Sequence, residues 1–381
     1  MASPTITPEP AAQPQGRRGR RWRPRRPRWV TVVLLATNAV AVAALVAVVV
    51  YWFLYLLPPA PDPFTRGPFL IRLSETGAKL AWTLPGGGPV SLAAVSPAGT
   101  TVIARDGRFS GLKPGTRYVW TASVGGDARS SGSFTTAPAT LATPITFAVI
   151  GDYGSGNEHE WEVARTLAAE SPDFVLTAGD NSYLAAVPQN LDRNIFEPLH
   201  QVMTGAPVWA TEGEHDLFFE NGRFVTDALH LPGTAGRWVI DYGPVQIVAL
   251  GLQADAASIA QLRRLSRTTH PAVRFVLVHR PIGPSDPIAR VLRATGVTAV
   301  FSGHLHRYER RVVGGVNEFT VGVSGQGPGA PQFTRRSPDA IVSLLNYGSL
   351  RVDIAGGVIR YAFIDENGHV LDSATQHLPA R

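Results

Sequence analysis

The chain has 381 residues and contains no cysteine. This absence excludes disulfide bonds, so the domains must be stabilised by their cores. It also excludes thiolate ligands, so any metal site must use carboxylate, imidazole or phenol groups. The sequence further lacks an internal repeat, a P-loop and a GxSxG motif, which argues against solenoids, P-loop NTPases and α/β-hydrolases.

An excess of positive charge is found only at the N-terminal end. The chain carries a net charge of +6, but residues 1–28 hold eight arginines and one glutamate, which leaves a net charge of −1 for the rest. A nucleic-acid-binding protein needs basic residues clustered on its folded part. No nucleic-acid partner is therefore expected.

A long apolar run follows the arginines. Residues 29–57 carry no charge over 29 positions, more than the ~20 residues that cross a bilayer core. The positive-inside rule then predicts a disordered basic cytoplasmic tail (1–28), a single-pass anchor in the cell membrane (29–57) and an extracytoplasmic remainder. A cleavable signal peptide is the alternative, although its apolar region is normally only about 7–15 residues long.

Two domains are expected after a Pro-rich linker at residues 58–63. Residues 64–137 read as short β segments between Gly and Pro turns, a pattern typical of a β-sandwich. From residue 145 to 375, strands alternate with helical stretches, which indicates an α+β domain of stacked layers. The expected helices are 158–170, 190–204, 255–267 and 286–295, and the expected hairpins pair 310–313 with 319–321 and 350–354 with 358–364.

Five short motifs follow strand-like apolar runs in this second domain. They are GDYG (151–154), GDNSY (179–183), GEHD (213–216), VLVH (276–279) and GHLH (303–306). Sites in open α/β sheets form at the carboxyl ends of strands, and a preceding glycine allows the chain to turn sharply there. The five motifs together predict a binuclear metal site.

The ligand types indicate which metals are suitable. Carboxylates and imidazoles suit iron, zinc or manganese, and a shared Asp180 would hold two ions roughly 3.5–4 Å apart. A phenol ionises only near pH 10, so Tyr183 as a ligand implies a strongly Lewis-acidic ion such as Fe(III). The alternative is that Tyr183 packs below the site and the ions are zinc or manganese.

The motifs resemble those of the calcineurin-like metallophosphoesterases, and among them the purple acid phosphatases, whose pattern is GDxG, GDxxY, GNH(D/E), VxxH and GHxH. The last motif even continues as HRYER (306–310), like that family's GHxHxYER. The resemblance implies a four-layer αββα sandwich. Residues 112–118 and 134–138 resemble a fibronectin type III domain, a module that precedes the catalytic domain in plant-type purple acid phosphatases.

The resemblance also implies roles for individual residues. The ferric ion would be held by Asp152, Asp180, Tyr183 and His306. The second, divalent ion (Fe, Zn or Mn) would be held by Asp180, Glu214, His279 and His304. His215 would contact the phosphate or protonate the leaving group, with Asp216 orienting its imidazole. Asn157 either reaches the phosphate or only closes a turn.

Glu214 departs from the family pattern, which has asparagine at this position. The carboxylate adds a negative charge, which strengthens metal binding but lowers the Lewis acidity of the ion and crowds the phosphate position. The alternative is that Glu214 is displaced from the metals and the chain is a catalytically weakened, membrane-tethered binding protein.

The sequence therefore predicts an extracytoplasmic, membrane-anchored metallophosphoesterase of the acid phosphatase type. It would hydrolyse phosphate monoesters of small molecules by attack of a metal-bound hydroxide. A phosphodiesterase or nucleotidase of the same fold is the alternative. The physiological substrate and the oligomeric state stay open, because specificity lies in loops around the site.

Overall fold

The computed structural model describes residues 28–51, 66–84, 87–234, 236–327, 329 and 331–379. The chain divides into two compact units, residues 1–57 and residues 58–381. The described part of the first unit is helix α1 (Arg28–Tyr51). Among the residues that can be described, no helix meets the length and hydropathy needed to cross a membrane. Residues 1–27 of the predicted tail, 52–57 of the predicted anchor and the linker 58–63 lie outside the described residues.

The second unit begins with a β-sandwich of two antiparallel sheets. One sheet has the strand order β1 (Phe69–Leu73), β2 (Gly77–Ala81), β5 (Arg108–Ser110). The other has the order β4 (Thr101–Ile103), β3 (Val90–Val95), β6 (Arg117–Val124), β7 (Asp127–Thr135). Phe109, Trp120 and Phe134 fill the space between them and are fully buried. The expected sandwich is present, and its assignment as fibronectin type III stays a prediction.

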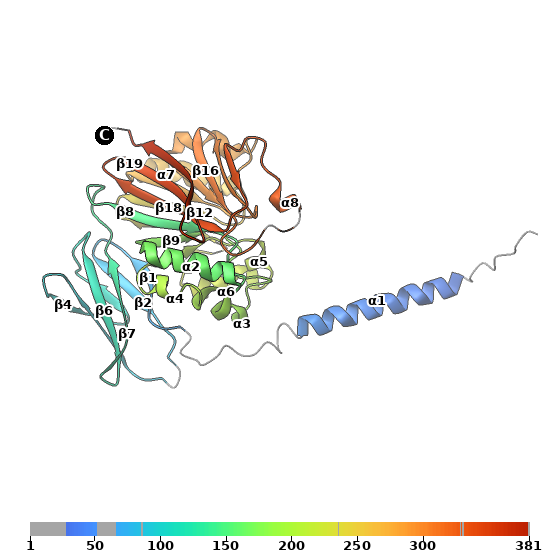
Figure 1. The fold of residues 1–381 in the computed structure, drawn as a ribbon, viewed down its shortest axis with the longest axis horizontal. Helices are drawn as coiled ribbons and strands as arrows, with labels where there is room; N and C mark the ends of the chain where they lie inside the picture. Colours follow the sequence, from blue (N-terminus) through green and yellow to red (C-terminus); the bar gives the residue numbers. More distant parts are fainter. Residues whose placement is uncertain are drawn as a thin grey trace, which may run out of the picture. The chain divides into compact units, whose positions relative to one another are not determined.

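The α+β domain that follows contains two larger sheets (Figure 1). The six-stranded sheet has the order β10 (Val208–Ala210), β9 (Phe174–Thr177), β8 (Ile145–Ile150), β18 (Gly348–Ala355), β19 (Val358–Asp365), β20 (Val370–His377). The seven-stranded sheet has the order β11 (Arg237–Tyr242), β12 (Val245–Leu250), β13 (Val273–Leu277), β14 (Ala299–Ser302), β16 (Val316–Val321), β15 (Tyr308–Val313), β17 (Val342–Leu344).

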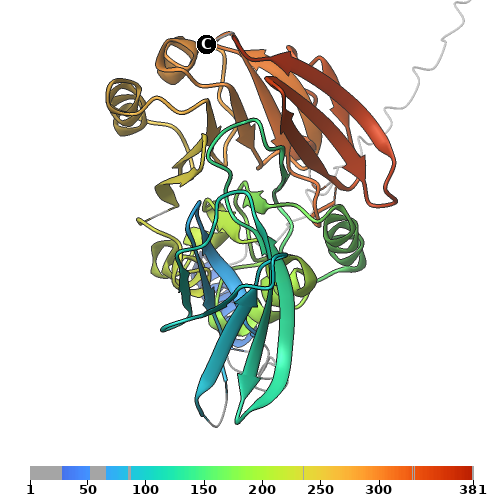
Figure 2. The ribbon, with the colours of Figure 1, turned by 90° about the vertical axis from the view of Figure 1, so that its left-hand side faces the viewer.

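Aromatic rings pack between the facing surfaces of the two sheets. Phe147 of β8 lies 5.3 Å from Phe275 of β13, and Phe319 of β16 lies 4.5 Å from Tyr361 of β19, measured between ring centroids. Helix α2 (Glu158–Glu170) packs against the six-stranded sheet, and α7 (Ala256–Thr268) buries its apolar face against the seven-stranded one (Figure 2). The predicted α+β arrangement of sheets and helices is confirmed.

The helices agree only partly with the sequence. Helix α2 has the predicted bounds and α7 is shifted by one residue. The expected helix 190–204 is broken into α3 (Pro188–Leu191), a π-helical segment (Asp192–Phe196) and α4 (His200–Met203). The stretch 286–295 forms two 3₁₀ turns, Pro287–Arg290 and Arg293–Thr295. The remaining short helices are α5 (Glu214–Leu217), a 3₁₀ turn (Glu220–Gly222), α6 (Arg223–Ala228) and α8 (Pro331–Thr334).

Parallel pairing places the five motifs at one rim. Strands β8, β9 and β10 run parallel in one sheet, and β12, β13 and β14 run parallel in the other. The carboxyl ends of parallel strands meet at the same edge, which is where the ligand-bearing turns begin.

The β-sandwich is tied to the α+β domain by hydrogen bonds. The indole Nε1 of Trp120 donates to the Thr204 carbonyl at 2.9 Å, and the Tyr242 hydroxyl donates to the Thr135 carbonyl at 3.1 Å.

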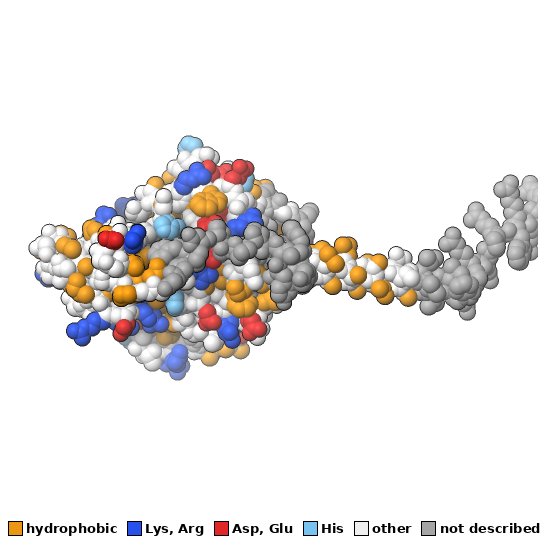
Figure 3. Space-filling model, turned by 90° about the horizontal axis from the view of Figure 1, so that it is seen from below, with side chains coloured by type: hydrophobic (Ala, Val, Ile, Leu, Met, Phe, Trp, Pro, Cys, Tyr) orange, Lys and Arg blue, Asp and Glu red, His pale blue; other side chains and the backbone are white. Residues whose placement is uncertain are grey.

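On the face shown in Figure 3, acidic and basic side chains are interspersed over this unit.

Candidate metal centre

The ligand-bearing turns use unusual backbone geometry. Asp152, Asp180 and His304 have φ angles of 51°, 50° and 68°, in the left-handed region that costs non-glycine residues on the order of 1 kcal/mol. A Cβ atom at Gly213 would overlap the Asp180 carboxylate, and one at Gly303 would overlap the Asp152 carboxylate. These two glycines therefore allow the backbone to approach the ligands closely.

The first predicted ligand set is brought together around Asp152. The Tyr183 hydroxyl donates to Asp152 Oδ1 at 3.1 Å and to Asp180 Oδ2 at 3.0 Å. His306 Nε2 lies 3.6 Å from Asp152 Oδ1. Tyr183 thus contacts both carboxylates and His306 lies beside Asp152, and the identity of the ion stays a prediction.

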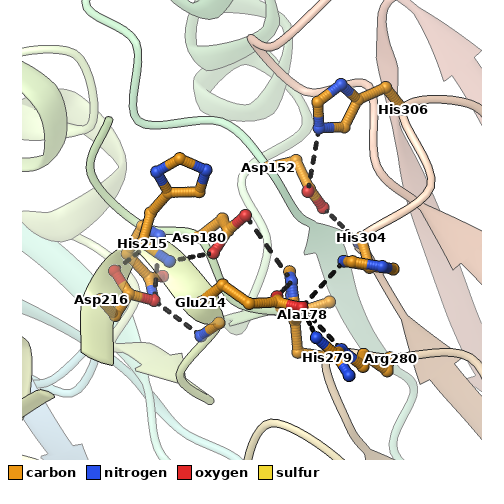
Figure 4. Close-up of polar contacts among 12 residues, drawn as sticks. Asp152, Ala178, Asp180, Glu214, His215, Asp216, His279, Arg280, His304 and His306 are labelled. Carbon is orange, nitrogen blue, oxygen red and sulfur yellow. Dashed lines mark hydrogen bonds and ion pairs between the residues drawn. The ribbon is translucent and has the colours of Figure 1, made fainter. Parts of the chain in front are cut away.

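The second set forms beside it, as Figure 4 shows. Ligand atoms of Glu214, His279 and His304 all lie within 4.8 Å of one another. Asp180 Oδ2 lies 3.6 Å from His279 Nε2, and the same oxygen accepts from Tyr183. Asp180 therefore lies between both sets, as a bridging ligand must.

Two buried ligand atoms lack hydrogen bonds, which tests whether the site fits metal ions. Glu214 Oε2 and His279 Nε2 are buried and neither accept nor donate a hydrogen bond within the described part of the chain. Glu214 Oε2 and His279 Nε2 lie only 2.6 Å apart, yet not in hydrogen-bond geometry. Buried polar atoms rarely stay unpaired, so a donor set of this chemistry fits a bound cation.

The tautomer of His279 is fixed by a hydrogen bond to a backbone carbonyl. Its Nδ1–H donates to the Ala178 carbonyl at 2.7 Å, so Nε2 is the nitrogen that faces the carboxylates. Metal-binding histidines are oriented in this way by a backbone carbonyl on the second nitrogen.

The electrostatics describe an anionic cluster that binds protons when no cation is present. Burial raises the pKa of Asp152 to about 8. Burial alone would lower the pKa of His279, but the carboxylates of Asp180 and Glu214 raise it overall to about 10. Burial opposes ionisation of Glu214, yet the facing His279 and His304 hold its pKa well below the usual range. Metal ions would replace these protons, since ligands bind in their deprotonated forms.

The predicted role of Asp216 is wrong. The His215 imidazole is oriented by a backbone carbonyl, because its Nδ1–H donates to Leu184 O at 2.6 Å. The Asp216 carboxylate instead accepts from the backbone N–H groups of Asn181 and Gly213, each at 2.9 Å. Asp216 thus ties two motif turns together, and burial raises its pKa to about 8.

His215 lies next to the two ligand sets, and its role towards phosphate stays a prediction. Its backbone N–H donates to Asp180 Oδ1 at 2.9 Å, and its ring packs 4.4 Å from the Tyr183 ring. Asn157 is the N-cap of α2: its Oδ1 accepts from the Glu160 N–H at 3.0 Å, and its Nδ2 donates to the Gly325 carbonyl at 2.8 Å. These contacts favour the turn-closing interpretation of Asn157.

Sequence reasoning missed two residues beside the ligands. Arg280 Nε donates to Glu214 Oε1 at 2.6 Å, and the Phe333 ring lies 5.1 Å from His306 and 5.5 Å from His304. Arg280 directly follows the ligand motif at 276–279, and that position was the available signal. Phe333 belongs to no motif, and nothing local indicates its position.

The sequence profile of the calcineurin-like phosphoesterases matches residues 145–308. That span includes every predicted metal ligand. Residues 145–308 are therefore similar to a calcineurin-like phosphoesterase domain. The prediction of a phosphoesterase enzyme is therefore confirmed.

Curated relatives are purple acid phosphatases. Purple acid phosphatase 22 of Arabidopsis thaliana is 27% identical over 266 residues, which cover 58% of this chain and 60% of the relative. Purple acid phosphatase 21 of the same plant is 28% identical over 237 residues, covering 52% and 51%. The chain thus spans between about half and three fifths of the length of these relatives.

Solved structures agree with the fold. Purple acid phosphatase PPD1 from yellow lupin (Lupinus luteus) seeds superposes with a TM-score of 0.67 at 14% identity, covering 81% of this chain and 73% of that one. PhoD superposes with a TM-score of 0.55 at 14% identity, covering 84% and 90%. At such identities the likeness concerns the fold alone.

Proposed function

We propose that this chain is a binuclear-metal phosphatase that hydrolyses phosphate monoesters. The observation that carries the proposal is the pair of ligand sets around Asp180, whose buried atoms Glu214 Oε2 and His279 Nε2 have no hydrogen bond within the described residues. Such an arrangement suits two ions that share one carboxylate. The purple acid phosphatase relatives support the same reaction class.

The side chains that would hold the ions are those of the two converging sets. The first site comprises Asp152, Asp180, Tyr183 and His306, and the second comprises Asp180, Glu214, His279 and His304. When bound, the two ions would polarise the phosphate and lower the pKa of bound water towards neutral pH. The Tyr183 oxygen lies beside the Asp152 and Asp180 carboxylates, where a phenolate would reach the first ion; we propose that this ion is ferric and that the second is divalent.

His215 is proposed as the proton donor to the leaving group. The Leu184 carbonyl holds its Nδ1–H, so the proton that can move lies on Nε2. The backbone N–H of His215 also fixes Asp180, which ties the position of the proton donor to that of the bridging ligand. A general acid has to lie within hydrogen-bond reach of the oxygen that it protonates.

Apolar side chains border the site and favour a substrate with an apolar or aromatic leaving group. Leu184 is 61% exposed and Phe218 is 60% exposed. The Phe218 ring lies 5.1 Å from the His215 ring. The Phe333 ring packs against the rings of His304 and His306. Exposed apolar groups of this size next to a polar site commonly contact a ligand.

The experiment is a substrate panel on the full-length chain, purified in detergent and loaded with iron and zinc. We expect turnover of aryl and alkyl phosphate monoesters, loss of turnover on chelation, and at least a 100-fold lower kcat for His215→Ala. Asp127→Ala, an exposed change in the β-sandwich, is the matched control. Faster hydrolysis of diesters or nucleotides than of monoesters would assign a phosphodiesterase or nucleotidase instead. No turnover of any ester would refute a phosphatase.

We also propose that residues 29–57 anchor the chain in the cell membrane, with the phosphoesterase domain outside. The support is the arginine-rich segment before an uncharged apolar run. External protease on intact cells should remove the domain and leave residues 1–28 protected. A soluble secreted form that begins near Ala60 would instead show a cleaved signal peptide.

A further inference from the structure

The two carboxylate oxygens of Glu214 have different surroundings. Oε2 is buried and faces His279 Nε2 at 2.6 Å. Oε1 accepts from Arg280 Nε at 2.6 Å, lies 2.5 Å from Arg280 Nη2, and lies 3.3 Å from His304 Nδ1. In Figure 4 the Glu214 side chain extends between the metal-binding histidines and Arg280. One oxygen is therefore available to an ion, and the other is held by a guanidinium.

This pairing bears on the charge of the site. The family pattern has a neutral asparagine where this chain has Glu214, so the substitution alone adds one negative charge beside the place of a phosphate. Arg280 adds one positive charge at hydrogen-bond distance from that carboxylate. The pair as a whole is neutral, like the amide that it replaces.

Arg280 also has donors to spare. A guanidinium carries five N–H groups, and Glu214 uses only Nε and Nη2, while Nη1 makes one long contact of 3.4 Å to Gln253 Oε1. The side chain is 44% exposed. Glu214 therefore engages only part of the guanidinium, and the rest stays accessible to solvent.

We propose that Glu214 binds the second ion through Oε2 alone, while Arg280 holds Oε1 and keeps the site able to accept phosphate. Arg280 is thus a positioning residue that acts through Glu214 and balances its charge. The proposal rests on the proposed two-metal function. It explains how this chain accommodates a carboxylate at a position where the family has an amide.

A purely structural ion pair is the competing explanation. Exposed pairs often contribute little, and this chain has one of similar length in Arg165 and Glu162, 2.6 Å apart on α2 with side chains 61% and 43% exposed. Glu214 differs because its side chain is only 22% exposed and its second oxygen lies among the ligands. Arg165→Ala is therefore a matched control.

The test compares full-length wild type with Arg280→Ala, Arg280→Lys, Glu214→Asn and the Glu214→Asn/Arg280→Ala double variant. Metal per chain is measured by elemental analysis after dialysis against a series of free zinc concentrations. Binding of inorganic phosphate to the metal-loaded chain is measured by calorimetry. Neither readout needs turnover, so each variant reports on the site itself.

We expect Glu214→Asn to bind the second ion about tenfold more weakly, because a charged ligand is lost. Arg280→Ala should keep both ions but bind phosphate about tenfold more weakly, since the carboxylate is then unbalanced. The double variant should recover phosphate affinity to within about threefold of wild type, and Arg280→Lys should be intermediate, because it keeps the charge but not the planar fork. Arg165→Ala should match wild type.

Three results would overturn the inference. One is phosphate affinity of Arg280→Ala within about twofold of wild type, as for a surface pair. Another is a double variant as weak as Arg280→Ala. The third is unchanged affinity for the second ion in Glu214→Asn. If the wild type itself binds fewer than two ions and no phosphate, both the proposed function and the inference are refuted. If the wild type binds two ions and phosphate but any of the three results is found, only the inference is refuted.

Discussion

Removing the metal ions should make the protein less stable as the pH rises from 5 to 7. Burial raises the pKa of both Asp152 and Asp216 to about 8, whereas an unfolded aspartate titrates near pH 3.9. Between these values the folded chain holds two protons that the unfolded chain has released. Because the unfolded state binds fewer protons, the free energy of unfolding falls as the pH rises.

The size of the effect follows from the number of protons. Each carboxyl contributes up to about 1.4 kcal/mol per pH unit in this window. Asp152 and Asp216 together give a decrease of up to about 3 kcal/mol per pH unit, against a total stability of roughly 5–15 kcal/mol for a typical domain. His279, whose pKa is raised to about 10, extends the decrease above its ordinary value near 6.5.

The assay is urea unfolding of the chelated full-length chain at pH 5, 6 and 7, repeated with metal. Asp216→Asn should reduce the pH slope by the share of one carboxyl, while Asp127→Asn, exposed on the β-sandwich, should leave it unchanged. Added metal should remove the share of Asp152, because ions stabilise the ionised ligands, and leave the share of Asp216, which belongs to neither ligand set. Stability of the chelated chain that is constant or increases between pH 5 and 7 would refute the reasoning.

Three further predictions concern single side chains. Tyr183→Phe should abolish a visible phenolate-to-iron absorption band in the iron-loaded protein, and a colourless, iron-free wild type with full activity would contradict the ferric assignment. Gly213→Ala should remove metal binding, since its Cβ overlaps the Asp180 carboxylate; elemental analysis that still finds two ions would show that the turn relaxes instead. Phe218→Ala should raise KM for an aryl phosphate about three- to tenfold with little change for phosphoserine; equal changes for both substrates would remove its role in specificity.

That the candidate ligands gather in one place was predictable from the sequence, because each of their motifs follows a strand and contains a turn. Parallel pairing then brings the turns of β8, β9, β13 and β14 to one rim, so a local pattern determines a shared location. Asp180 illustrates this, since its place between the two sets follows from its motif alone.

Other features depend on tertiary contacts that the sequence does not display. Asp216 is adjacent to His215 in the chain, but its carboxylate turns towards the backbone of Asn181. Phe333 reaches the site from α8, far from any motif. The helix expected at 190–204 is interrupted by a π-helical segment. The buried Asn194 of this segment donates to the Tyr183 carbonyl at 2.7 Å. The irregular segment therefore supports the loop that carries Tyr183.

Metal stoichiometry tests the central claim most directly. Elemental analysis of the reconstituted full-length chain, alongside Asp180→Ala, measures whether one carboxylate serves two ions. We predict two ions per chain in wild type, at most one in Asp180→Ala, and loss of phosphatase activity with the ions. Two ions and full turnover in Asp180→Ala, or an active wild type with no bound metal, would contradict the binuclear account.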